Sequence, residues 1–456
     1  MSHIPEDELL LYAMQSGALS AGRRVEIESH LATCAECQER HDFLAIHDEG
    51  AVDEALMEED TWEPVFGSPT YDALMEHGAR VAEEDREAEE LLRSYLEHPI
   101  RIAWDALTTK RRYRTGGVVR KLNAAAHANY KNKPRVALTF ADAAISIAEL
   151  LPDDMYPARA VYQLRGAAWK ERANALMILG EFPQAHESLD RAQRAYAKTP
   201  HSGLGLSIVA LVRAGVLYAQ LRPDEALVMA ERAERGFAHA GDEKRRMDAA
   251  FLRASILFEA GDPNRALPIF RGIIEHGENT QNEQWIALGS YAAANCEVDR
   301  GDMGEASILF HRALRTFRKQ GPETERLLTE WGIARVIFHG GKLHEAINRM
   351  RAIAVELEKR GMATYAAYVG LDIVEGLLAL NHPKEIVELA QRLFSAFTKA
   401  GMLTGALSAL AYLKEAAATN RLTRQDVAAV RTFLQRVERQ PSLQFVPPPR
   451  PPEDRI

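Results

Sequence analysis

Histidine and cysteine residues near the start of the sequence carry the clearest chemistry in the chain. His30, Cys34 and Cys37 follow one another at intervals of four and three residues. On a helix this spacing places the side chains on one face, over successive turns. Imidazole nitrogen and thiolate sulfur suit Zn²⁺, whose structural sites take four tetrahedral ligands. The motif therefore predicts a zinc site that needs one more ligand. The sequence offers three candidates: His3 upstream, and His41 and His47 downstream.

This ligand set favours a structural role for the metal over a catalytic one. Two thiolates and two imidazoles leave no open coordination position, and the sequence places no carboxylate base beside them. A domain this short buries little apolar surface. Bound zinc would then supply folding free energy directly, on the order of 10 kcal/mol or more.

Three short helices within residues 5–47 are expected to position these ligands. The first opens at Pro5, and a third follows the two cysteines. Between them, Ser20 is a good N-cap for a helix that runs from Arg23 to Leu31. We expect this middle helix to bury three apolar side chains: Val25, Ile27 and Leu31.

The order of these elements resembles the zinc-binding anti-sigma factor family. The residues that carry the likeness are DELLLYAMQSGALSAGRRVEIESHLATCAECQER, and they cover roughly the first tenth of the chain. The resemblance implies that His30, Cys34 and Cys37 are zinc ligands and that the fourth ligand precedes them, where His3 stands. Some members of the family sense oxidants through a disulfide from an upstream cysteine. Because this chain has His3 at that place, we do not expect such a switch here.

Members of that family hold an alternative sigma factor of the extracytoplasmic-function type away from RNA polymerase. The resemblance implies that the helices around the zinc, with a following helix within residues 70–97, wedge between the two sigma domains. Residues 49–97 contain 16 Asp and Glu but only 3 Lys and Arg. Such an acidic arm would complement the partly basic surface of a sigma factor. A solvated linker that contains a helix is the simpler interpretation of the same charge run.

From about residue 160 to 400 the sequence repeats itself with a period of about 40 residues. One turn residue recurs in each unit: Gly180, Leu221, Gly261, Gly301, Gly341 and Asn381. Glycine at such a place predicts a left-handed turn that closes the preceding helix. Prolines soon after it fit the first turn of the next helix. These prolines are Pro183, Pro223, Pro263 and Pro383.

An apolar stripe with the spacing i, i+4, i+7, i+11 follows each turn, which is typical of the core face of a helix. One example is Ala306, Phe310, Ala313 and Phe317. A second glycine set is expected to close the second helix of each unit: Gly241, Gly321, Gly361 and Gly401. Each unit is therefore a helical hairpin, and six such units stack.

The hairpins resemble tetratricopeptide repeats. Segments that carry this likeness are NALMILGEFPQAHESLDRAQRAY at 174–196 and EASILFHRALRTF at 305–317. The usual tetratricopeptide period is about 34 residues, so the helices here are expected to be longer. Armadillo or HEAT repeats are the alternative for a longer period, but the small-residue pattern favours the tetratricopeptide class. We expect a degenerate first unit at 116–151 and a capping pair of helices at 403–419 and 423–438.

Stacked hairpins form a curved solenoid whose groove suits a protein or peptide ligand. Polar residues on the first helices are candidates to line this groove. They are Arg165, Arg172, Asn174, Arg213, Arg253, Tyr291, Asn295 and Arg335. We expect Cys296, the third cysteine, to be a buried small apolar residue.

Composition excludes several other classes of function. The net charge of −9, with Glu26, Glu28 and Glu36 around the zinc motif, argues against direct binding of nucleic acid. Residues 101–135 are basic, and we interpret them as a charged helix face beside the acidic segment. No apolar run is long enough to span a membrane, and the acidic N-terminus lacks a signal-peptide core, so we expect a cytoplasmic protein.

The sequence also lacks a phosphate-binding loop, a metalloprotease helix motif and a nucleophile elbow, so we do not expect an enzyme. The prediction is an all-α protein: a zinc-binding module at 1–47, an acidic linker with a helix at 48–100, a solenoid at 101–438 and a mobile Pro-rich tail at 439–456. Its expected function is that of a cytoplasmic anti-sigma regulator. The alternative is an interaction scaffold with a purely structural zinc module.

Overall fold

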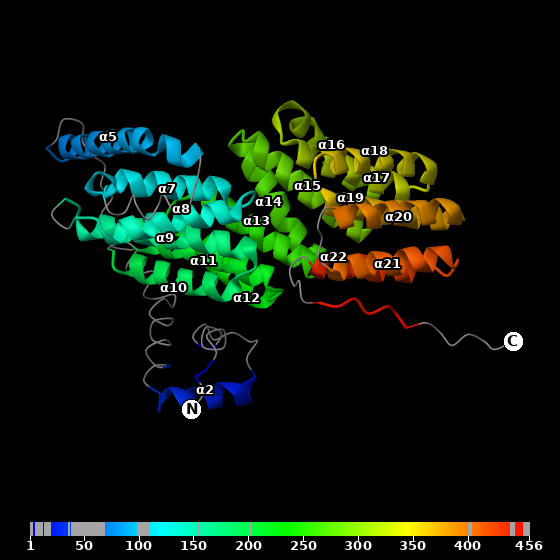
Figure 1. Cartoon of the computed structure of the whole chain (residues 1–456), viewed down its shortest axis with the longest axis horizontal. Helices are drawn as coiled ribbons and strands as arrows, with labels where there is room; N and C mark the ends of the chain where they lie inside the picture. Colours follow the sequence, from blue (N-terminus) through cyan, green and yellow to red (C-terminus); the bar gives the residue numbers. More distant parts are fainter. Residues whose placement is uncertain are drawn as a thin grey trace. The chain divides into compact units, whose positions relative to one another are not determined.

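The computed structural model describes residues 3–4, 12, 20–34, 37, 69–97, 110–152, 155–199, 202–399, 404–437 and 443–449. Within these ranges the regular structure is entirely helical, as predicted. The chain divides into two compact units, Met1–Ile256 and Leu257–Ile456. Figure 1 shows the successive helices of each unit lying side by side as antiparallel hairpins.

The first unit contains the metal-binding motif and the first hairpins. Its helices are α2 (Ala21–Leu31), α5 (Pro69–Glu97), α7 (Gly116–Asn129), α8 (Pro134–Glu149), α9 (Ala158–Leu179), α10 (Phe182–Ala197), α11 (Gly203–Ala219) and α12 (Pro223–His239), and the boundary between the units falls within α13 (Glu243–Glu259). A 3-10 turn at Arg111–Tyr113 precedes α7. The degenerate first repeat predicted at 116–151 is therefore the hairpin of α7 and α8.

The second unit continues the same pattern. Its helices are α14 (Pro263–Asn279), α15 (Glu283–Arg300), α16 (Met303–Gln320), α17 (Glu323–His339), α18 (Leu343–Lys359), α19 (Ala363–Ala379), α20 (Pro383–Lys399), α21 (Thr404–Ala418) and α22 (Arg424–Val437). The last two match the predicted capping pair. A reciprocal pair of hydrogen bonds like a capping box opens α22: Asp426 N donates to Thr423 Oγ1 (3.2 Å), and Thr423 N donates to Asp426 Oδ2 (2.8 Å).

The apolar stripes of the second helices form the core, as predicted. In α10 the stripe residues Ala185, Leu189 and Ala192 are fully buried. In α16, Ala306, Phe310 and Ala313 are likewise fully buried. Small residues alternate with large ones, so neighbouring helices approach closely and still fill the space between them.

Left-handed turns between helices do not coincide fully with the glycines of the repeat. Leu221 and Asn381 occupy two of the predicted glycine slots and adopt φ of 61° and 59°, as a left-handed turn requires. Gly321 is the exception, with φ of −84° and ψ of 160°. Pro322 follows it, and a residue before proline is pushed into extended backbone. Gly401 lies outside the described residues.

Helix α5 packs on α7, the first helix of the solenoid. Ala88 and Leu92 of α5 are buried in one apolar cluster with Val118 and Leu122 of α7. Ion pairs flank this cluster: Arg120 Nε lies 2.8 Å from Asp85 Oδ1, and Lys121 Nζ lies 2.8 Å from Glu89 Oε2. The basic residues after 101 thus include a charged helix face beside acidic residues, as we interpreted them.

A close backbone approach fixes the position of α5. Gly117 N donates to Glu84 Oε2 (3.0 Å), and a Cβ atom at Gly117 would stand 2.4 Å from the carbonyl oxygen of Glu84. Tyr156 joins the same contact by donating to Glu84 Oε1 (2.7 Å), and burial raises the pKa of Tyr156 to about 12. Only glycine at position 117 permits this docking, since any side chain would displace α5.

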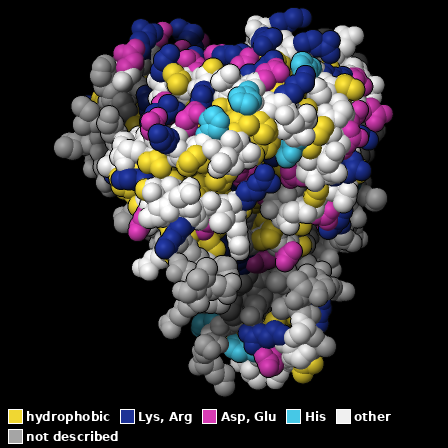
Figure 2. All heavy atoms as spheres, turned by 90° about the vertical axis from the view of Figure 1, so that its right-hand side faces the viewer, with side chains coloured by type: hydrophobic (Ala, Val, Ile, Leu, Met, Phe, Trp, Pro, Cys, Tyr) yellow, Lys and Arg dark blue, Asp and Glu magenta, His cyan; other side chains and the backbone are white. Residues whose placement is uncertain are grey.

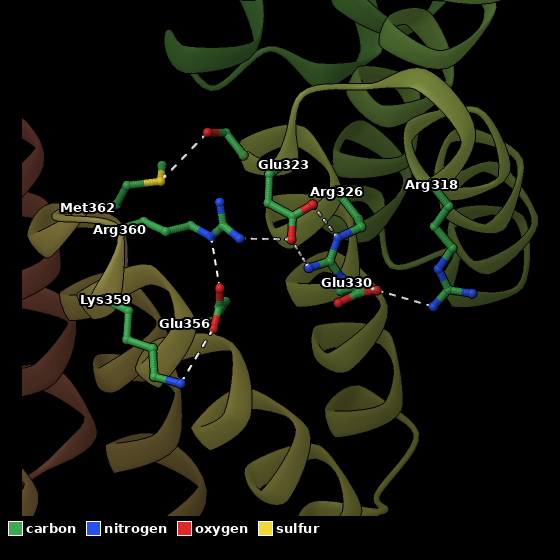
Figure 3. A network of polar contacts seen from close by, with 9 residues as sticks. Arg318, Glu323, Arg326, Glu330, Glu356, Lys359, Arg360 and Met362 are labelled. Atoms are coloured by element: carbon green, nitrogen blue, oxygen red, sulfur yellow. Dashed lines mark hydrogen bonds and ion pairs between the residues drawn. The ribbon is translucent and has the colours of Figure 1, made fainter.

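A polar network links three helices of the second unit (Figure 3). Arg326 of α17 lies between Glu323 and Glu330, at 2.9 Å from an oxygen of each. Arg360, which ends α18, lies 3.2 Å from Glu323 Oε1 and 2.9 Å from Glu356 Oε1. These ion pairs are partly exposed, and such pairs contribute little to the free energy of unfolding.

The C-terminal segment contributes to the second core. Phe445 contacts the rings of Tyr412 and Phe433, with centroids 5.3 and 5.1 Å away. Leu443 also packs against this core. These two residues of the predicted mobile tail are therefore packed, because an apolar pair precedes the proline run.

Charged side chains of both signs lie on one face of the described residues (Figure 2). On the face drawn in Figure 2, Lys and Arg are interspersed with Asp and Glu among the coloured, described residues. None of the helices in the described ranges combines the length and the apolar character needed to cross a membrane.

Candidate metal centre

Helix α2 and the turn after it position three of the four predicted ligands. Ser20 caps the helix by accepting a hydrogen bond from Arg23 N (3.2 Å), as predicted. His30 lies in the last turn of α2. Cys34 N then donates to the carbonyl of His30 (2.9 Å), which folds the chain back so that the thiol returns to the histidine.

The structure brings His3, His30, Cys34 and Cys37 into one cluster. Their candidate ligand atoms all lie within 4.8 Å of one another. His3 Nδ1 lies 3.6 Å from Cys34 Sγ and 3.5 Å from Cys37 Sγ. A nitrogen and a sulfur bound tetrahedrally to one Zn²⁺ would stand about 3.6 Å apart, given Zn–N near 2.0–2.1 Å and Zn–S near 2.3 Å. The cluster therefore has dimensions that fit a four-coordinate zinc ion.

The ring nitrogen Nε2 of His30 in this cluster is also suited to bind a metal. His30 Nε2 is buried and has no hydrogen-bond partner among the residues that the structure describes. A buried polar atom without a partner costs about 1–3 kcal/mol, so such atoms are rare unless something else binds them. Cys37 is fully buried beside it. A metal ion would satisfy both groups at once.

Within the described part of the module, few apolar side chains surround the four ligands. Ile4, Ile27, Leu31 and Cys37 form the buried cluster of this module, with Tyr12 and Cys34 partly buried against it. The prediction for Val25 is wrong, because its side chain is 65% exposed. Val25 precedes Ile27 by two residues, which is about 200° around a helix, so it points away from the core. His41 and His47, the alternative fourth ligands, lie outside the described residues.

A match to a known family covers this module. Residues 6–38 match the family model described as "Putative zinc-finger". The match to this zinc-finger family spans less than a tenth of the 456 residues and includes His30, Cys34 and Cys37, whereas His3 precedes it. No curated protein sequence matches the chain.

Several solved structures of Rap proteins are similar to the chain at low identity. The apo form of RapI shares 14% identity over 59% of this chain and 99% of its own, with a TM-score of 0.44. A Rap protein complexed with competence and sporulation factor shares 15% over 78% and 99%, with a TM-score of 0.43. Aspartyl phosphate phosphatase F from Bacillus subtilis shares 12% over 88% and 95%, with a TM-score of 0.49.

Three arginines predicted to line the solenoid groove instead join neighbouring helices. Each pairs with a carboxylate of the preceding helix: Arg172 with Asp142 (2.9 Å), Arg213 with Asp190 (2.7 Å) and Arg253 with Glu234 (2.8 Å). They recur at the repeat period because these three consecutive repeats make the same contact. Their spacing therefore reflects packing of the repeats.

The other groove candidates are also partly buried in the solenoid. Asn174 is buried and donates to Glu171 (3.0 Å), and Arg165 donates to the carbonyl of Ala148 (3.2 Å). Burial raises the pKa of Tyr291 to about 12, and Asn295 donates to the carbonyl of Tyr291 (3.0 Å). Arg335 is half-buried. Cys296 is buried as predicted, and burial raises the pKa of its thiol to about 12.

Proposed function

We propose that residues 3–37 form a structural zinc module ligated by His3, His30, Cys34 and Cys37, and that this module binds a sigma factor of the extracytoplasmic-function type. The cluster of four donor atoms within 4.8 Å carries the proposal. The zinc-finger family match over 6–38 supports the metal. The sigma partner comes from the resemblance to anti-sigma factors. Zinc here would hold the segment at His3 against the end of α2 and the turn after it, and it would take no part in a reaction.

The exposed face of α2 supports a protein-binding role for the module. Val25 is one of the large apolar side chains that remain exposed, and Glu26 and Glu28 beside it are exposed too. An apolar residue ringed by charged ones is a common anchor in protein interfaces, in which the centre is apolar and the rim polar. A basic sigma surface would meet Glu28 favourably, whereas Glu26 already pairs with Arg23 (2.6 Å).

The docking of α5 on α7 limits which part of the chain we assign to the sigma contact. The resemblance to anti-sigma factors assigns a helix within 70–97 to the wedge between sigma domains. In this structure Ala88 and Leu92, on the apolar face of α5, are buried against α7. We therefore assign the sigma contact to the module alone. The same docking favours the alternative function, in which the protein is a scaffold whose zinc is purely structural.

The helical hairpins would receive the second partner in either case. We propose that a protein or peptide bound to the solenoid changes how the module meets its sigma factor, in the cytoplasm, where transcription occurs. Regulation in this sense requires a coupling free energy between the two sites, typically 1–3 kcal/mol. The proposal assigns no catalytic step to the chain.

The test is capture of partners from the native cell with the full-length protein. A matched pair of variants separates the zinc module from general effects: Cys34→Ser with Cys37→Ser removes two ligands, and Cys296→Ser changes the thiol outside the cluster. We expect one Zn²⁺ per chain in the wild type and in Cys296→Ser, and none in the double variant. A sigma factor should be recovered with the wild type and with Cys296→Ser, and should be absent with the double variant.

Two results would contradict the proposal. Zinc retained by the double variant would mean that these cysteines are not ligands. Recovery of the same partners by all three proteins, without a sigma factor, would instead establish the scaffold function.

A further inference from the structure

A pocket of about 400 Å³ opens on the surface between the end of α8 and the helices α9 and α10. This volume lies within the range of known ligand sites. Its lining residues are Glu149, Tyr162, Arg165, Trp169, Glu187, Arg191, Arg194, Ala195 and Lys198. None of them belongs to the metal centre, and only Arg165 is a predicted groove residue.

Two parallel rows of side chains build this pocket. Tyr162, Arg165 and Trp169 follow one face of α9 at intervals of three and four residues. Arg191, Arg194 and Lys198 follow α10 and its C-cap in the same way. Seven residues of helix rise about 10 Å, so each row is about that long.

The pocket has an excess of positive charge. Four cations face two carboxylates, and both carboxylates are engaged: Glu187 lies 2.7 Å from Arg191, and Glu149 lies 3.8 Å from Arg165. Arg194 and Lys198 have no carboxylate partner within the described part of the chain. Arg194 Nε only donates to the carbonyl of Asp190 (3.3 Å), and Lys198 Nζ lies over the Tyr162 ring at 5.1 Å.

Aromatic rings lie against three of the four pocket cations before any ligand arrives. The guanidinium of Arg191 lies 4.6 Å from the centre of the Trp169 ring, and the Tyr162 ring has Lys198 at 5.1 Å and Arg165 at 5.9 Å. Such contacts contribute about 0.5–1 kcal/mol each at exposed sites. Cations ordered in advance lose less side-chain entropy when they bind an anion.

We propose that this pocket binds an acidic peptide segment of a partner protein. Arg194 and Lys198 are four residues apart on a helix, or about 6 Å along its axis. Carboxylates at positions i and i+2 of an extended peptide are about 6.6–6.8 Å apart. One acidic side chain can therefore meet each cation. This inference deepens the proposed partner-binding role of the solenoid and depends on that role.

Nucleic acid is the less favoured ligand for this pocket. Glu149 and Glu187 line it, and closely spaced phosphates would be repelled by both carboxylates. A peptide with alternating acidic residues can place neutral groups beside them.

Fluorescence anisotropy with the full-length protein tests the proposal. The probe is a labelled octapeptide of alternating Glu and Ala, with a Gln and Ala peptide of the same length as its neutral counterpart. We expect the Glu peptide to bind more tightly, and added salt to weaken it. Arg194→Gln with Lys198→Gln should weaken the Glu peptide by about tenfold or more.

A matched control separates the pocket from overall charge. Arg159→Gln with Lys244→Gln removes two exposed cations of the same unit that do not line the pocket. This variant should bind the Glu peptide as the wild type does. The double variant Cys34→Ser with Cys37→Ser should also bind normally, so failure of the zinc proposal would leave this result intact.

Specific outcomes would overturn the proposal. Equal binding of the Glu and Gln peptides, no binding of either, or equal losses in the pocket and control variants would each do so. Inorganic phosphate that displaces the peptide at equal concentration would indicate a site for small anions. Tighter binding of a labelled single-stranded octanucleotide would indicate a nucleic-acid site.

Discussion

The metal module and the solenoid reach stability by opposite means. The module buries Ile4, Ile27, Leu31 and Cys37, and little else among its described residues. Each hairpin of the solenoid buries a full apolar stripe and packs against the neighbouring hairpins. A repeat array adds up many local interfaces, whereas a small module depends on one centre. Loss of a single ligand residue should therefore unfold the metal module. Loss of a single residue in the solenoid should lower its stability only by the contribution of that residue.

The largest expected effect is loss of the metal centre. Cys37→Ser, or removal of metal by a chelator, should unfold the module, because metal binding supplies on the order of 10 kcal/mol to such sites. Hydrogen exchange of the full-length protein should show lost protection in α2 and unchanged protection in α7 and α8. Cys296→Ser is the control and should leave α2 protected. Protection of α2 that survives chelation would show that the apolar cluster suffices.

Removal of a large core side chain should have the next largest effect. Phe310 is fully buried in the second unit, and Phe310→Ala should lower its free energy of unfolding by about 3–5 kcal/mol. Ile308→Ala is the matched control on the same helix, since Ile308 is 65% exposed, and should change stability by less than about 0.5 kcal/mol. Denaturant unfolding measures both, and equal effects would refute the predicted difference.

A smaller effect is expected at the docking of α5. Gly117→Ala would place a Cβ atom 2.4 Å from the carbonyl oxygen of Glu84, so α5 should shift at a cost of about 1–3 kcal/mol. Limited proteolysis within α5 should become faster. Gly272→Ala is the control, because nothing lies within 4 Å of that position in α14 and alanine favours a helix by about 1 kcal/mol. Unchanged proteolysis of Gly117→Ala would argue against the docking.

The smallest effect concerns a buried carboxylate in the first unit. Burial by itself raises the pKa of Glu171, but His127, Lys170 and Asn174 outweigh it, and the net pKa is lowered. A carboxylate whose folded pKa is lowered stabilises the fold above its unfolded pKa, near 4.3, and this stabilisation is lost as the pH falls. Glu171→Gln should therefore cost about 1–2 kcal/mol at pH 7 and less at pH 3.

Thermal unfolding of wild type and Glu171→Gln at both pH values checks this expectation. Glu187→Gln serves as the control, since Glu187 forms an exposed ion pair with Arg191 and should shift stability by about 0.5 kcal/mol or less at either pH. A constant difference between wild type and Glu171→Gln across the pH range would contradict the titration of Glu171.

Local spacing in the sequence was enough to predict the helices and most of the turns. The apolar stripes and the glycine slots act within a few turns of one helix, so periodicity specifies them. The ligand cluster needed more than spacing, because α2 ends at Leu31, before Cys34 and Cys37, and His3 joins them from 31 residues upstream of Cys34. The boundaries proposed at 1–47, 48–100, 101–438 and 439–456 remain predictions. Charge alone did not indicate whether residues 70–97 would reach a partner or pack on the chain itself.

Contacts between distant segments were decided only by the tertiary structure. Gly117 meets Glu84 across 33 residues, and the arginines of the first helices meet carboxylates of the preceding ones. The pocket cations Arg194 and Lys198 face Tyr162 and Trp169 of another helix. Such placements depend on how helices pack against one another, and the periodicity of the sequence within one helix does not specify them. The sequence therefore determined which residues could form a site, and packing determined which of them remain available to a partner.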